Sequence, residues 1–127
     1  MNIPSAEYFE VFLDKIYHCK KPFEVKVRDR MPKTRMGSYS PSFYRINIYS
    51  KWIVACPLEE IAIHEYAHHI HWTEHEGHRR NGDDRMHGKN FWRIYSALMS
   101  RATRLGLYHD YLIEDIVEEY RIPYGNL

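Results

Sequence analysis

The sequence predicts an α+β fold in which a small sheet of about three strands, antiparallel or mixed, packs on a central helix. Two segments, 23–28 and 43–49, alternate apolar and polar residues with the period of a strand. Three longer segments, 5–17, 57–72 and 87–105, carry apolar residues at helical spacing. The 127 residues suffice for one hydrophobic core, so we expect a single domain over residues 1–127.

The composition is that of a globular protein, with 44% hydrophobic and 28% charged residues. No apolar run approaches the ~18 residues that span a bilayer, so no membrane partner is expected. Residues 1–7 lack the basic-then-apolar order of a signal peptide, which favours a cytoplasmic location. There Cys19 and Cys56 should stay reduced, and neither belongs to a CxxC pair that would indicate a thiolate zinc site.

The first helix is expected over residues 5–17, within an N-terminal segment 1–19. Ser5 can cap it, and Glu7 lies in the first turn, where a negative charge is favourable. The residues that follow the i, i+3, i+4, i+7 rule should form its buried stripe: Phe9, Phe12, Leu13 and Ile16. This helix is scaffold without visible chemistry.

The strands open the core, which we place at residues 23–105. Tyr39 can belong to a short strand between the two alternating segments, while residues 38–42 are rich in turn formers and Gly37 suits a turn or a bulge. Consecutive strands suggest an antiparallel meander or a set of hairpins. An edge strand of such a sheet could accept an extended peptide as one more strand.

The next helix, expected from Pro57 to Trp72, carries the motif His-Glu-x-x-His. His64 and His68 are four residues apart, so both can point at one ion, with Glu65 beside them. Imidazoles suit zinc, and a zinc ion with an open coordination position activates a water whose proton the glutamate can take. We therefore expect one catalytic zinc ion. The predicted buried stripe of this helix is Ile61, His64, His68 and Trp72.

The motif leaves the third ligand open. The metzincin pattern is HExxHxxGxxH. Its glycine and last histidine would fall at positions 71 and 74, which are His71 and Glu74 here, so the sequence does not match it. A gluzincin-type enzyme would use a glutamate from a later helix, Glu114 or Glu118. His87 opens the helix expected to end at Leu105, which would hold it rigidly. The other candidates lie in the metal helix and the polar loop after it: His71, His75, His78, Asp83 and Asp84. We expect His69 and His71 to project from other sides of the helix.

A last helix is expected over residues 110–120, within a C-terminal segment 107–127. Asp110 can cap it, and Gly106 suits the end of the helix before it. Its predicted inner face comprises Leu112, Ile113, Ile116, Val117 and Tyr120.

The run His87-Gly88-x-x-Phe91-Trp92, placed after the HExxH and a polar loop, resembles the SprT-like (Spartan) zinc metalloproteases. Gly-x-Tyr at 37–39, Arg-Ile-x-Ile at 45–48 and Pro-x-Glu-Glu at 57–60 resemble them too. The resemblance, which covers about residues 23–105, implies a zincin-like core and zinc held by His64, His68 and His87, with Glu65 as general base. It also implies cleavage of peptide bonds, in some members in proteins crosslinked to DNA. The YgjP-like metallopeptidases end their motif similarly but with a much shorter loop.

The sequence thus predicts a zinc metalloendopeptidase acting on proteins or peptides. The alternative is a non-catalytic, zinc-stabilised module that binds DNA or another partner. Residues 20–51 carry nine lysines and arginines against Glu24 and Asp29, a balance compatible with DNA but also with solvated strand faces.

Overall fold

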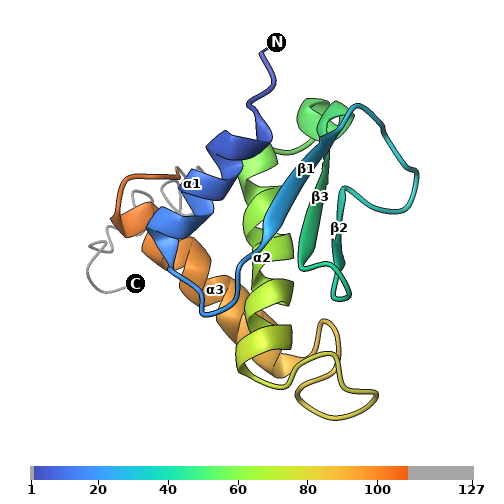
Figure 1. Cartoon of the computed structure of the whole chain (residues 1–127), viewed down its shortest axis with the longest axis vertical. Helices are drawn as coiled ribbons and strands as arrows, with labels where there is room; N and C mark the ends of the chain where they lie inside the picture. Colours follow the sequence, from blue (N-terminus) through green and yellow to red (C-terminus); the bar gives the residue numbers. More distant parts are fainter. Residues whose placement is uncertain (1, 109–127) are drawn as a thin grey trace, which may run out of the picture.

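The computed structural model describes residues 2–108 and has the predicted α+β class. The elements follow in the order α1 (Ala6–Ile16), β1 (Glu24–Arg28), β2 (Gly37–Ser40), β3 (Arg45–Tyr49), the 3-10 helix η1 (Ser50–Val54), α2 (Leu58–Glu74) and α3 (Lys89–Arg104). In Figure 1 the sheet lies on one side of α2 and α3 on the other, and α1 packs against both β1 and α2. The helix predicted over 110–120 lies outside the described residues.

The three strands form a mixed sheet in the order β1-β3-β2. β1 pairs with β3 in parallel, and β2 pairs with β3 antiparallel. The expected antiparallel meander is therefore wrong, because β3 lies between the two earlier strands. Burial explains the order: Ile46 and Ile48 of β3 are fully buried, whereas every residue of β2 is half-buried. The most apolar strand takes the central place, and the Ser- and Gly-containing strand takes an edge.

Helix α1 agrees with its prediction. The Ser5 hydroxyl accepts a hydrogen bond from the backbone N–H of Tyr8 at 3.2 Å and so caps the helix. The four residues of its predicted apolar stripe are all buried, and they pack with Val25 of β1 and Ile63 of α2 in one core. Cys19 and Cys56 are free thiols, as predicted. Within residues 2–108 no helix has the length and hydropathy that a membrane span requires.

Helix α2 is buried on most of its circumference, because the sheet, α1 and α3 all pack against it. The single predicted stripe is thus too narrow, and it is wrong at Trp72, whose side chain is 40% exposed near the C-terminal end of the helix. His64 is half-buried, whereas Glu65 and His68 are buried. A helix enclosed in this way can place polar groups in the interior only where they find partners.

Helix α3 buries Phe91, Leu98, Met99 and Ala102 on the side that faces the core. The helix ends at Arg104, and Leu105, its expected last residue, is the 49% exposed capping residue. Gly106 follows with a φ of 72°, the left-handed conformation that glycine adopts at no steric cost.

The segment 38–42 is not a turn, since β2 extends to Ser40 and the turn comprises residues 41–44. Gly37 is neither a turn nor a bulge residue but the first residue of β2. A Cβ atom there would lie 2.7 Å from Cγ2 of Ile61, 2.9 Å from the carbonyl oxygen of Asn47 and 3.0 Å from Cγ of Glu65. The glycine therefore allows the edge strand to approach α2 beside the HExxH motif.

We expect Gly37→Ala to lower the free energy of unfolding by about 1–3 kcal/mol, the usual cost of overpacking. Urea denaturation would measure it, with Ser40→Ala at the other end of the same strand as the control. Equal stability of the two variants would contradict the close approach.

Candidate metal centre

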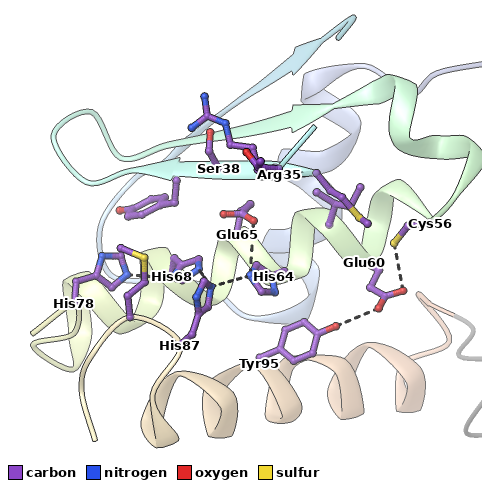
Figure 2. A pocket seen from close by; sticks show the side chains of 16 residues that line it. Arg35, Ser38, Cys56, Glu60, His64, Glu65, His68, His78, His87 and Tyr95 are labelled. Atoms are coloured by element: carbon purple, nitrogen blue, oxygen red, sulfur yellow. Dashed lines mark hydrogen bonds and ion pairs between the residues drawn. The ribbon is translucent and has the colours of Figure 1, made fainter. Parts of the chain in front are cut away.

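Three histidine side chains, two from helix α2 and one from the loop before α3, converge at one point. Nε2 of His87 lies 3.3 Å from Nε2 of His64 and 3.0 Å from Nε2 of His68. Ligand atoms of the three side chains all lie within 4.8 Å of one another. The structure thus brings His87, from the end of the loop between α2 and α3, to the two histidines of the HExxH motif (Figure 2).

The spacing of these nitrogens fits a tetrahedral metal ion. Metal–nitrogen distances of about 2.0–2.1 Å place two ligands of such an ion about 3.3 Å apart, close to the 3.0 and 3.3 Å found. Hydrogen bonds alone do not account for the cluster, because a neutral imidazole carries one N–H and three Nε2 atoms meet here. A cation at the centre could be coordinated by the lone pairs of all three Nε2 atoms.

The ring of Phe91 packs against all three imidazoles of the cluster. Its fully buried ring stacks on His68 with centroids 4.2 Å apart, and it lies 5.1 Å from the ring of His64 and 5.0 Å from that of His87. Trp92 packs against His64 and His87 but is 45% exposed, so it covers the cluster from the solvent side. The aromatic residues of the HGxxFW run therefore fix the orientation of the imidazoles.

Glu65 lies beside the cluster and is only 6% exposed. Its Oε2 is 3.9 Å from Nε2 of His64, and its side chain points between α2 and β2 (Figure 2). Burial raises the pKa of Glu65 to about 8. A carboxyl group in this position would be returned to its ionised form by a cation at the histidine cluster.

Burial also holds the clustered imidazoles in their neutral form. Burial foremost, together with the neighbouring histidines, lowers the pKa of His64 to about 4 and that of His68 to about 2. Neutral imidazole is the form that binds metal ions. The cluster is therefore prepared for a cation at neutral pH rather than for a proton.

A cavity of about 460 Å³ opens over the cluster. The edge strand β2 forms one wall with Gly37, Ser38 and Tyr39, and α2 forms the floor with residues 60, 61, 64, 65 and 68. Met86, His87 and Tyr95 close the opposite side. Figure 2 shows that the imidazoles and Glu65 face this space, so a bound molecule would contact them directly.

His78, an alternative ligand in the sequence, lies on the other side of His68. Its Nε2 is 3.1 Å from Nδ1 of His68, whereas Nε2 of His68 faces the cluster. His68 can thus donate its Nδ1–H to His78, an outer hydrogen bond that fixes the tautomer of a metal ligand. His75 is exposed and is not in the cluster, and Glu114 and Glu118 lie outside the described residues.

His69 and His71 project from other sides of α2, as predicted, yet both are fully buried with tertiary partners. The backbone oxygen of Lys21 accepts from Nε2–H of His69 at 2.9 Å, so Nδ1 accepts from the hydroxyl of Tyr39 at 2.7 Å. The bond from Tyr39 fastens the edge strand β2 to α2, and the bond to Lys21 fastens the segment before β1. The sequence did contain a signal, because two extra histidines in an apolar helix need partners in the core.

His71 fastens the loop that carries His87. Its Nε2–H donates to Oδ1 of Asp84 at 3.1 Å, and Asn90 of α3 donates to the same oxygen at 2.9 Å. These two hydrogen bonds, that of Asn90 foremost, lower the pKa of Asp84. Gly77 lies so close to the His71 ring that a Cβ there would be 2.3 Å from Cγ. The loop is thereby held against α2 and α3.

The basic residues of segment 20–51 are mostly solvated. Lys26, Arg28, Arg30, Lys33 and Arg35 are exposed. Arg45 forms an ion pair with Glu24 across the paired strands β1 and β3, at 2.5 Å.

Comparison of the chain with protein-family models, with curated proteins and with solved structures finds no match. The functional conclusion therefore depends on the geometry of the histidine cluster and its surroundings.

We expect Asp84→Ala to lower the melting temperature by about 4–8 °C, because the buried N–H of His71 loses its acceptor. The same variant should bind zinc more weakly, since the loop that positions His87 is released. Asp83→Ala is the matched control, because Asp83 contributes its backbone oxygen to Asn90 and that oxygen remains. Identical melting temperatures and zinc affinities in both variants would show that Asp84 does not hold the loop that positions His87.

Proposed function

We propose that this protein is a zinc-dependent metallopeptidase, with His64, His68 and His87 as ligands and Glu65 as general base. One observation carries the proposal: three Nε2 atoms converge beside a buried glutamate on the floor of an open cavity. The SprT-like resemblance of the sequence, with its zincin-like core, agrees with this assignment.

Zinc is the metal that the donor set favours. Three imidazole nitrogens leave one position of a tetrahedron open, which is the arrangement of catalytic zinc sites, whereas calcium and magnesium prefer oxygen ligands. A bound zinc ion would polarise the scissile carbonyl and lower the pKa of a coordinated water towards ~7.

The protein's own groups would then move the proton and hold the ligands. The Glu65 carboxylate, on the cavity floor, accepts the proton of the attacking water and delivers it to the leaving amine. His78 keeps the tautomer of His68 through the 3.1 Å contact at Nδ1. Phe91 keeps the three imidazoles from rotating away.

An extended peptide is the substrate form that suits the cavity. β2 pairs with β3 on one side only, so its other edge offers backbone N–H and C=O groups, and three of its four residues line the cavity. A peptide added along this edge would pass over the histidine cluster. Proteins associated with DNA, implied by the family resemblance, are one class of substrate that could present such a segment.

We expect Glu65→Gln to retain zinc and to lose at least about 10²–10⁴-fold in peptide cleavage, because the amide keeps the shape of the side chain but cannot take a proton. Zinc content by mass spectrometry and cleavage of unfolded casein would be measured together. Glu59→Gln is the control, since Glu59 bonds to Tyr8 of α1 at 3.2 Å, away from the cavity.

Cleavage by Glu65→Gln at the wild-type rate would show that another group is the base. Bound zinc without cleavage in the wild type, and with a fourth protein ligand in a metal-bound structure, would favour the non-catalytic module.

The histidine variants separate ligand, outer partner and bystander. His87→Ala should lose zinc to a chelator that leaves the wild type loaded, because only two imidazoles remain. His78→Ala should weaken zinc binding about 10–100-fold, the usual effect of removing an outer hydrogen-bond partner. His75→Ala should match the wild type, since this side chain is exposed. Equal retention in the His87 and His75 variants would refute the ligand assignment.

A further inference from the structure

The cavity extends beyond the histidine cluster to a carboxylate that the proposed chemistry does not use. Glu60 lies four residues before His64, so it is on the same face of α2, about one turn or ~6 Å along the helix axis. Its side chain lines the same cavity as His64 and Glu65. Figure 2 shows it at the end of the cavity opposite His78.

Neutral donors orient this carboxylate. The hydroxyl of Tyr95 donates to Oε1 at 3.4 Å, and that of Tyr108 donates to Oε2 at 3.2 Å. The thiol of Cys56 lies 3.7 Å from Oε2. A carboxylate has about four acceptor sites, so these contacts leave capacity for a further donor. The group is therefore held in position without being neutralised by them.

Within the described part of the chain, no cationic side chain pairs with Glu60 either. Among residues 2–108, neither a lysine nor an arginine forms an ion pair with it. Arg35 also lines the cavity, but its guanidinium lies over the ring of Tyr49, 5.6 Å from the centroid, and Figure 2 shows it directed away from Glu60. Over the described residues, this end of the cavity thus presents a carboxyl group that has no cationic partner.

The cavity also has apolar lining that suits an aliphatic chain. Met36, Cys56 and Ile61 contribute to it, and Cys56 and Ile61 lie next to Glu60. Lysine and arginine side chains combine such an apolar stem with a charged head. The four methylenes of a lysine cover roughly the distance of one helical turn, the separation of Glu60 from His64.

We propose that Glu60 forms a subsite for a cationic side chain, lysine or arginine, of a substrate bound at the metal centre. This inference rests on the proposed function, because it takes the cavity as the substrate cleft. The selectivity would come from a charge-assisted hydrogen bond in a half-buried site, which a neutral side chain of equal length cannot make.

The test uses two metal-binding probes that differ by one ammonium group, lysine hydroxamate and norleucine hydroxamate. Their affinities for the zinc-loaded full chain would be measured by calorimetry. The wild type should bind the lysine compound about tenfold or more tightly, the range for a hydrogen bond between charged groups. Glu60→Gln, which keeps the shape and the tyrosine contacts, should bring the ratio to about one. Glu59→Gln, on the α1 side of the helix, should keep the wild-type ratio.

Equal affinity of the two probes in the wild type, or an unchanged ratio in Glu60→Gln, would overturn the subsite. Failure of both probes to bind would also overturn it, because an open metal position beside Glu60 is its premise. The outcomes distinguish it from the proposed function: a lysine preference without any peptide cleavage supports the subsite and refutes the peptidase. Peptide cleavage without a preference for the lysine probe supports the peptidase and refutes the subsite.

Discussion

The rest of the structure depends on how helix α2 accommodates four histidines between positions 64 and 71. An imidazole in a packed interior costs free energy unless its nitrogens find partners. Both nitrogens of His69 find partners in Tyr39 and the backbone of Lys21, whereas His71 pairs only its Nε2, with Asp84. The other two histidines face each other and His87 across a space that suits a cation. Each imidazole thereby determines where another part of the chain must lie.

The edge strand is the first part positioned in this way. Gly37 lets β2 approach the helix beside Glu65, and the hydrogen bond from Tyr39 to His69 holds the strand at that distance. Burial under the strand keeps Glu65 away from bulk water and raises its pKa. The same approach makes β2 a wall of the cavity. The close contact of Gly37 with α2 therefore serves both the packing of the sheet and the burial of Glu65.

The loop between α2 and α3 is the second part. Three of its residues, Glu76, His78 and His87, have positive φ values of 51°, 62° and 61°, a conformation that costs free energy for residues other than glycine. The hydrogen bonds that join Asp84 to His71 and Asn90 offset this cost. The loop in this conformation places His87 in the cluster and His78 beside Nδ1 of His68. Strain in the loop and order at the site are therefore linked.

The sequence by itself determined the local features: the capped helix α1 with its apolar stripe, the helix that carries HExxH, and the shared face of His64 and His68. Spacing along one helix sets these, since positions four apart always lie together. The HGxxFW run also indicated that His87 belongs with them. Only the tertiary structure decided the strand order, the exposure of Trp72, and the partners of His69, His71 and His78. These depend on contacts between residues far apart in the chain, because hydrophobic packing is non-directional and spacing does not name the opposite partner. The carboxylate of Glu60 likewise became a feature of the cavity only when α2, α3 and the strand edge came together.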